Sequence, residues 1–272
     1  MTPLCRWMAA SACAAVLLTG CNRGQAPKDA PSGPATTQPG SAAEQSRGDR
    51  QGAASASCRD LPSADDLRKW LREAPGEGEA GGLMSGRMEW AAIVSRSGEV
   101  CATAVATEDP ASAWPGSQAI AKAKAYTANA YSTDASPMST ARLYTLSQPG
   151  HSLWGVAEPN PFNAGCVVAP ADAAKTDGRI CGGSIAFGGG LPLYRSKTRV
   201  GGLGVSGDTA CADHEIAKRM RHLAGLDPEK GEFADDITYS SVDGPSVFSH
   251  PLCPNTWRNG TKVGEEAKAS GY

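Results

Sequence analysis

Two glycine-rich stretches decide the fold: GGGLPL at residues 188–193 and VGGLGVSG at residues 200–207. Residues 200–205 are apolar and partly β-branched, which predicts a strand. Its glycines allow close packing of the backbone. The Gly188–Gly190 segment predicts a tight turn that borders a pocket, since glycine tolerates positive φ. A long amphipathic helix is predicted directly afterwards, over residues 211–224.

The same glycines formally match a nucleotide-binding motif. Gly202, Gly204 and Gly207 are spaced G-x-G-x-x-G, and Asp227 follows Gly207 by twenty residues. A dinucleotide site requires this motif to open a βαβ unit, with the acid on the second parallel strand. Here the glycines lie inside the predicted strand, and Asp227 lies in a loop before Pro228. We therefore interpret the glycines as packing positions.

Upstream, the pattern predicts helices and hairpin-forming strands. Ser63 begins a helix with Asp66 as its capping-box partner, and Pro75 ends it. The other expected elements are a hairpin of residues 87–95 and 99–107, helices over 118–131 and 140–146, strands over 153–157 and 183–187, and a single strand candidate, 237–239, in the tail after residue 226. This order predicts an α+β fold with an antiparallel sheet of about five strands and covering helices.

Composition limits the function classes. The chain has 272 residues and a formal net charge of −2, whereas a nucleic-acid binder needs a basic face. No nucleic-acid partner is expected. Nine cysteines are many for a protein of a reducing cytosol. The cysteines therefore indicate either export, metal centres or reactive thiols.

Residues 1–20 predict a secretory signal. The apolar stretch from Trp7 to Leu18 is shorter than the roughly 20 residues that span a bilayer. It ends in Leu18-Thr19-Gly20-Cys21, which resembles the lipobox of bacterial lipoproteins. The resemblance implies cleavage before Cys21 and acylation of that residue with fatty acids such as palmitate. The alternative is an ordinary signal peptide followed by a chance cysteine. We expect a lipid anchor in the bacterial cell envelope, on the outer membrane or the periplasmic face of the inner membrane.

Domain boundaries follow from composition. Residues 22–57 contain no large apolar residue and no cysteine. Such a segment buries too little surface to offset the entropy of ordering it, so residues 21–57 predict a lipidated cysteine and a disordered tether. Residues 58–272 predict one folded domain with a C-terminal extension.

Six cysteines remain in the predicted folded part, and an even number in an exported protein predicts disulfides. Cys166 and Cys181 flank one loop, so we expect them to pair. Elimination then suggests Cys58 with Cys101 and Cys211 with Cys253, among fifteen possible pairings. The absence of any C-x2-C spacing argues against a metal centre built from these thiols.

The glycine stretches resemble the two signature segments of the GlcG/HbpS-like haem-binding family. In that family a GGGLPI-like turn is followed by a VGAIGVSG-like strand and then by a helix. The upstream hairpin and the alanine-rich helix around Lys122 and Lys124 fit the same plan, so the resemblance covers residues 87–224. It implies an antiparallel sheet covered by helices, homo-oligomers, and haem or a related small ligand as the partner.

If haem is the cofactor, a histidine is a common iron ligand. His214 is the first candidate because it begins a helix after the Gly207 turn, and His151 and His250 follow. Gly188, Gly189 and Gly190 would border the pocket. A solvated or structural role is the alternative for each histidine, and no H-x3-H or H-E-x-x-H spacing indicates zinc.

Three functions remain open. The leading hypothesis is a membrane-tethered domain that sequesters or senses haem. A second is an enzyme acting on haem or a small organic acid, although no nucleophile–base pair or paired carboxylates can be identified. The third is a structural or interaction domain of the cell envelope whose ancestral pocket has been lost.

Overall fold

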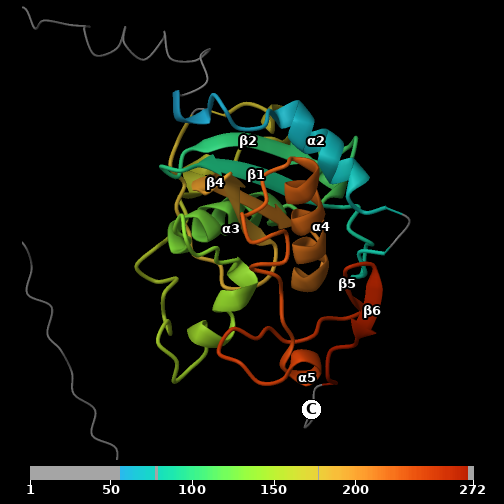
Figure 1. Cartoon of the computed structure of the whole chain (residues 1–272). Helices are drawn as coiled ribbons and strands as arrows, with labels where there is room; N and C mark the ends of the chain where they lie inside the picture. The colour runs from blue at the N-terminus through green and yellow to red at the C-terminus, as the bar shows by residue number, and fades with distance from the viewer. Residues whose placement is uncertain (1–55, 77–78, 177, 269–272) are drawn as a thin grey trace, which may run out of the picture. The chain divides into compact units, whose positions relative to one another are not determined.

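The computed structural model describes residues 56–76, 79–176 and 178–268 (Figure 1). The predicted signal, Cys21 and nearly all of the tether lie outside these residues. Among the described helices, none combines the length and the apolar character needed to cross a membrane.

A four-stranded antiparallel sheet runs through the domain in the order β2-β1-β4-β3. The strands are β1 (Trp90–Ser95), β2 (Val100–Val105), β3 (Gly190–Arg195) and β4 (Thr198–Ser206). The predicted hairpin is confirmed as β1 and β2, with the turn at residues 96–99. The α+β class is also confirmed.

The two glycine-rich stretches form neighbouring strands. GGGLPL enters β3, where Pro192 lies opposite Gly202 of β4. Because β3 is an edge strand, it can contain a proline, which has no N–H to donate to a ladder. The G-x-G-x-x-G residues lie in and just after β4, which runs antiparallel to both neighbours instead of opening a βαβ unit.

Helix α3 (Ser117–Tyr131) packs on one face of the sheet through the glycines of β4. A Cβ atom added to Gly204 would lie 2.0 Å from the carbonyl oxygen of Ala121. One added to Gly202 would lie 2.2 Å from the carbonyl oxygen of Ala125. The strand and helix backbones are thus in direct contact, which confirms the packing role predicted for these glycines.

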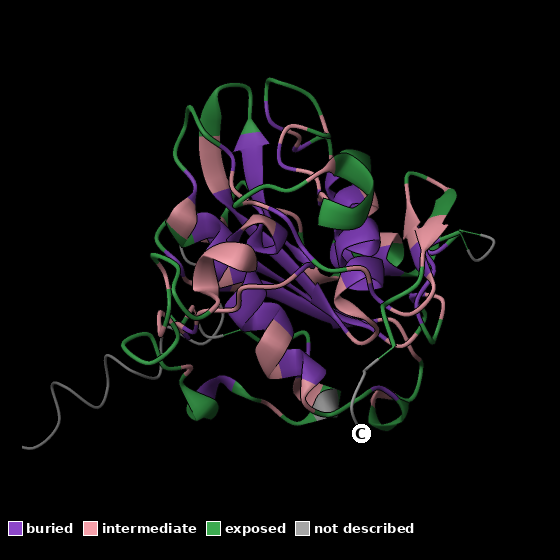
Figure 2. Cartoon of the chain, turned by 90° about the horizontal axis from the view of Figure 1, so that it is seen from below, coloured by how far each residue is buried: buried purple, intermediate pink, exposed green. Residues whose placement is uncertain are grey.

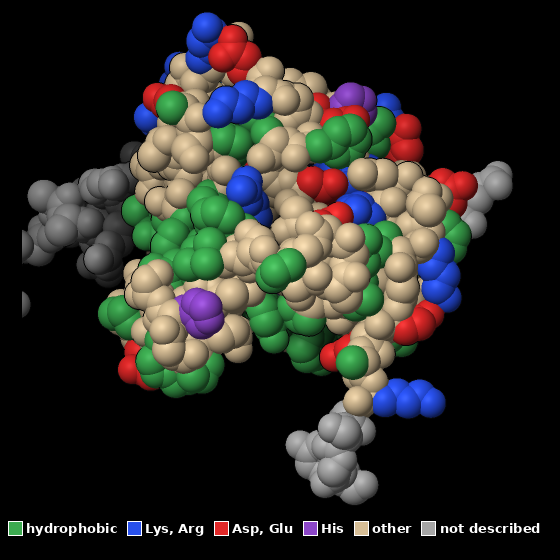
Figure 3. All heavy atoms as spheres, turned by 60° about the horizontal axis from the view of Figure 1, so that its bottom comes forward, with side chains coloured by type: hydrophobic (Ala, Val, Ile, Leu, Met, Phe, Trp, Pro, Cys, Tyr) green, Lys and Arg blue, Asp and Glu red, His purple; other side chains and the backbone are tan. Residues whose placement is uncertain are grey.

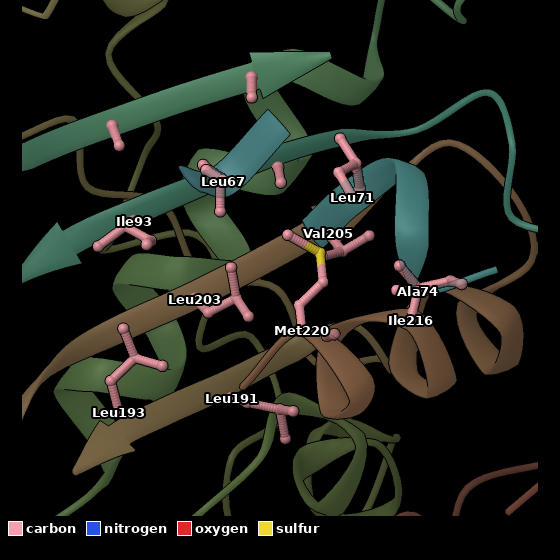
Figure 4. Packing of buried hydrophobic residues seen from close by; sticks show 14 of the residues in the cluster. Leu67, Leu71, Ala74, Ile93, Leu191, Leu193, Leu203, Val205, Ile216 and Met220 are labelled. Carbon is pink, nitrogen blue, oxygen red and sulfur yellow. The ribbon is translucent and has the colours of Figure 1, made fainter. Parts of the chain in front are cut away.

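The other face of the sheet carries the main hydrophobic core. Helices α2 (Ala64–Glu73) and α4 (Ala210–Leu223) cover it. Large side chains from both helices and from the strands interdigitate there (Figure 4), including Leu67, Leu71, Ile93, Leu191, Leu203, Val205, Ile216 and Met220. In Figure 2 the strands of the sheet and the helix segments beside them are coloured mostly as buried. Helices therefore cover both faces of the sheet.

Helix α2 begins with the predicted capping box. The Asp66 backbone N–H donates to Ser63 Oγ at 3.2 Å, and the Ser63 N–H donates to Asp66 Oδ2 at 3.1 Å. Each of these contacts satisfies a backbone donor at the helix start.

Several short elements differ from the sequence prediction. Residues 153–157 and 183–187 form turns and irregular chain instead of strands, because local bonds such as Val156 N–H to Leu153 O satisfy the backbone. Residues 140–146 form two 3₁₀ turns, and 237–239 form one bridge, Tyr239 to His250. The sheet of about five strands has four, and β5 (Thr256–Arg258) and β6 (Thr261–Gly264) form a separate pair. The remaining short helices are Ala56–Cys58, Pro110–Ser112, Thr140–Leu143, Thr145–Ser147, Ala164–Cys166, Pro170–Asp172 and α5 (Ser240–Asp243).

Three disulfides join the expected cysteines, so the suggested pairings are confirmed. Their Cα–Cα distances are 5.3 Å for Cys58–Cys101, 5.9 Å for Cys166–Cys181 and 5.9 Å for Cys211–Cys253. The third disulfide connects the beginning of α4 to the C-terminal extension.

Candidate functional site

His214 lies in the first half of α4, which begins where the Thr209 hydroxyl accepts the Ala212 N–H. The His214 side chain is fully buried, and its Nδ1 has no hydrogen-bond partner. Its Nε2 lies 3.4 Å from Asp236 Oδ1, and although burial acts in the opposite direction, this contact helps to lower the pKa of the Asp236 carboxyl. A buried polar group that lacks a hydrogen bond costs about 1–3 kcal/mol. The His214 Nδ1 is therefore a buried polar atom without a partner, whereas Nε2 faces the Asp236 carboxylate.

The glycine turn lies directly against this histidine. A Cβ atom on Gly188 would be 2.2 Å from the Ala210 carbonyl oxygen and 3.1 Å from His214 Cβ. The Gly188 N–H donates to His250 Nε2 at 3.3 Å. The structure thus brings together Gly188, His214 and His250, which lie far apart in the sequence.

His250 is buried and neutral. Burial lowers the pKa of its imidazole to about 4, against the opposing effect of the hydrogen bond with Pro251, and the nearby charge of Lys124 lowers it further. Its Nδ1–H donates to the Pro251 carbonyl oxygen at 2.7 Å. The aromatic rings of Tyr144 and Tyr239 lie beside it, with centroids 4.9 and 6.5 Å away.

A buried ion pair lies on the other side of the turn. Lys124 Nζ is 2.6 Å from Asp213 Oδ2 and donates to the Val205 carbonyl oxygen at 2.9 Å. The backbone of Gly189 approaches so closely that an added Cβ atom would be 2.7 Å from Lys124 Nζ. The Lys124 ammonium group is thus paired with the buried Asp213 carboxylate.

Glu89 is a buried acid that the sequence analysis missed. Both carboxyl oxygens are buried without a hydrogen-bond partner. Burial raises the pKa of Glu89 well above its ordinary value, and the charges of Asp213 and Asp208 raise it further. No sequence signal separates this residue from an ordinary surface glutamate, because its environment is formed by segments distant in the chain.

Replacing Glu89 with glutamine should change how stability depends on pH. The raised pKa means that above about pH 4.5 the folded chain binds more protons at this position than the unfolded chain, so stability falls as pH rises. Glu89→Gln cannot ionise, so its advantage over the wild type should grow with pH, by about 1.4 kcal/mol per unit of pKa difference. Urea denaturation at about pH 5 and about pH 8 measures this. An advantage that stays constant with pH would contradict the prediction.

The C-terminal extension, residues 227–268, covers the His214 site. Arg221 and Asp235, both fully buried, form an ion pair at 2.8 Å. Lys218 Nζ lies 3.3 Å from Asp236 Oδ1. Apolar side chains of the extension also pack against the beginning of α4, in a cluster of Ala141, Cys211, Ile237, Tyr239 and Cys253. Charges of both signs are interspersed over the face seen in Figure 3.

Haem iron could be held by the donors of this site, but the porphyrin has no room in this packing. His214 offers an imidazole nitrogen, Nδ1, that has no other partner, and imidazole is a common ligand of haem iron. It has 0 % exposure and His250 has 3 %, so no water-sized space surrounds the His214 ring. Two surface hollows among the described residues are lined by other side chains, one of about 380 Å³ by Pro254 and residues 265–268, and one of about 360 Å³ by residues of α2.

His151 is placed differently from the other two candidates. It is exposed in the loop after Pro149 and Gly150, and its backbone N–H donates to the Gln148 carbonyl oxygen. The structure therefore groups two of the three predicted histidines and leaves the third on the surface.

Comparison with known proteins gives a family and several structural neighbours. The model of a family described as "Haem degrading protein HbpS-like" matches residues 85–221. The chain resembles the solved PduOC:Heme complex with 24% identity over 61% of this chain and 97% of that one, at a TM-score of 0.41. It resembles Klebsiella pneumoniae protein ORFY with 22% identity over 59% and 89%, at a TM-score of 0.40. A structure of HbpS has 21% identity over 60% and 89%, at a TM-score of 0.39. No curated protein matches the chain.

Proposed function

Because the chain belongs to the HbpS-like family of haem degrading proteins, we propose that its folded part is a haem-binding domain. The observation that carries the proposal is His214, a fully buried imidazole beside the glycine turn whose Nδ1 has no partner. A buried nitrogen without a hydrogen bond costs free energy, and a bound ligand would offset that cost. Bound haem would supply an iron centre, and His214 would be the residue that holds it.

Access to His214 requires the extension to move. Residues 227–268 pack over α4 and leave no water-sized space at the ring, so haem reaches it only when these residues separate from α4. The form that can bind haem, with the extension separated from α4, is then a minor state. The apparent affinity for haem equals the affinity of this form multiplied by the fraction of molecules that adopt it. A covered site of this kind suits sensing better than constant storage.

We also propose the setting in which the domain acts. Cleavage before Cys21 and acylation of that cysteine would hold the chain on a membrane of the bacterial cell envelope. Residues 22–57 would then separate the domain from the lipid surface, and the domain would form homo-oligomers. All six cysteines of the folded part are paired in disulfides, which supports an oxidising compartment.

A hemin titration of the chain without residues 1–21 tests the proposal. We expect a saturable shift of the Soret band. His214→Ala should weaken binding at least about tenfold, or about 1.4 kcal/mol. His151→Ala removes an exposed histidine instead and should leave binding unchanged. Circular dichroism checks that both variants are folded.

The outcome also decides the second candidate function. The complete burial of His214 and the ion pairs that hold the extension favour a structural or interaction domain of the cell envelope. Absence of saturation in a folded chain, or an equal response of the two histidine variants, would overturn haem binding at His214 and support that alternative. A bound Soret band that decays under reducing conditions would instead indicate haem degradation, the activity in the family description.

A further inference from the structure

A second group of potential ligands lies at the disulfide between α4 and the extension. One ligand atom each from Cys211, His250 and Cys253 lies within 4.8 Å of the other two, and all three residues are buried. The two sulfurs form the Cys211–Cys253 disulfide. Two cysteines and a histidine are the ligand types that zinc prefers in proteins.

The surroundings favour the ligand forms of these side chains. Cys211 is the second residue of α4, where the positive end of the helix dipole stabilises a thiolate. Its backbone N–H donates to Cys253 Sγ at 3.2 Å, which would stabilise negative charge on that sulfur. His250 donates its Nδ1–H to the Pro251 carbonyl oxygen, the kind of second contact that orients metal-binding histidines. Its Nε2 accepts the Gly188 N–H, and a metal bound at that nitrogen would replace this hydrogen bond.

We propose that reduction of the Cys211–Cys253 disulfide creates a metal site formed by Cys211, His250 and Cys253, selective for Zn²⁺ and other cations that prefer thiolate and imidazole. A dithiol reductant supplies two electrons and two protons and becomes a disulfide, while the two cysteines become thiols. Binding of the cation then releases both thiol protons and forms two metal–sulfur bonds. Three protein ligands leave the fourth tetrahedral position for water.

Small movements suffice for this conversion. Zinc–sulfur bonds of about 2.3 Å and zinc–nitrogen bonds of about 2.1 Å place tetrahedral ligand atoms roughly 3.5–4 Å apart. The sulfurs must therefore separate by about 2 Å from their bonded distance. The cation would replace the covalent link between α4 and the extension, so the site remains cross-linked in both redox states.

This proposal is independent of haem binding. It uses neither His214 nor the family relationship. The other two disulfides provide matched controls, because among the described residues neither Cys58–Cys101 nor Cys166–Cys181 belongs to a group of three potential ligands.

Cobalt is the probe for the test, because thiolate-bound tetrahedral Co²⁺ has characteristic charge-transfer and d–d bands. The chain without residues 1–21 is reduced with a phosphine, freed of it under anaerobic conditions and titrated with Co²⁺. We expect thiolate–cobalt bands that saturate at one equivalent and disappear when Zn²⁺ is added. The oxidised chain should give no such bands.

Variants locate the ligands. Replacing both Cys166 and Cys181 with serine should preserve the bands, and replacing both Cys211 and Cys253 should abolish them. His250→Asn should weaken Co²⁺ binding at least about tenfold, or about 1.4 kcal/mol, while thiolate bands remain. Bands that persist without Cys211 and Cys253, or a folded reduced chain that binds no Co²⁺, would overturn the proposal.

If the reduced chain unfolds, alkylation of its cysteine thiols provides the test. Zn²⁺ should then restore the folded circular dichroism spectrum and slow alkylation of Cys211 and Cys253 more than that of Cys166 and Cys181. A reduced chain that Zn²⁺ neither refolds nor protects at these two positions would also overturn the proposal.

Discussion

Replacing Gly204 with alanine should destabilise the domain by about 3 kcal/mol or more. The new methyl group would lie 2.0 Å from the Ala121 carbonyl oxygen and 2.5 Å from the Ala125 backbone nitrogen. Both contacts are with the backbone of α3, which cannot turn aside as a side chain can. Overpacking of a well-packed core commonly costs about 1–3 kcal/mol, and a clash with backbone lies at or beyond the upper end. Urea denaturation followed by circular dichroism measures the loss.

Gly225→Ala is the control for this substitution. Gly225 has a φ of +64°, but an added Cβ atom would meet nothing within 4 Å. Its cost should be only the roughly 1–2 kcal/mol of a left-handed conformation. If Gly204→Ala unfolds at the same urea concentration as the wild type, the close contact between β4 and α3 is wrong.

Replacing Cys211 and Cys253 with serine should strengthen hemin binding at least about tenfold. The disulfide links two positions that are 42 residues apart and holds the extension on α4. A disulfide stabilises a fold by typically about 2–4 kcal/mol. Part of that energy opposes separation of the extension from α4. Removing the disulfide therefore increases the fraction of molecules in which the extension is separated and haem can reach His214. The apparent dissociation constant falls in proportion to that increase.

The matched control removes Cys166 and Cys181, whose disulfide closes a loop of residues 166–181 and does not involve the extension. This variant should bind hemin like the wild type. Equal affinity of all three proteins would contradict control of access by the Cys211–Cys253 link, and equal strengthening in both variants would indicate general loosening.

Local patterns predicted most of the central architecture. The β1–β2 turn, the Ser63 cap and the glycines of β4 are properties of contiguous residues, so the sequence contains their signal. Short apolar runs such as 153–157 were ambiguous, because a run of five residues fits a turn as well as a strand. Which face of the sheet each helix covers could not be predicted, since the spacing of apolar residues along a helix does not say which side of the sheet it packs on.

The candidate site was only partly predictable. His214 and the Gly188 turn follow one another in the predicted order, but the unpaired acid Glu89 depends on contacts with distant segments. The cluster of Cys211, His250 and Cys253 could not be predicted, because its residues are split between α4 and the extension and match neither C-x2-C nor H-x3-H spacing. The extension itself has weak periodicity, and its place over α4 depends on buried ion pairs such as Arg221–Asp235.

The most direct test of a haem site covered by the extension is hemin titration of the Cys211→Ser, Cys253→Ser chain with His214 present and with His214→Ala. We expect a saturable Soret shift with a higher affinity than in the oxidised wild type, and we expect that affinity to be lost, or weakened at least about tenfold, without His214. A shift with equal affinity in both proteins, or no shift in either while both are folded, would contradict this expectation.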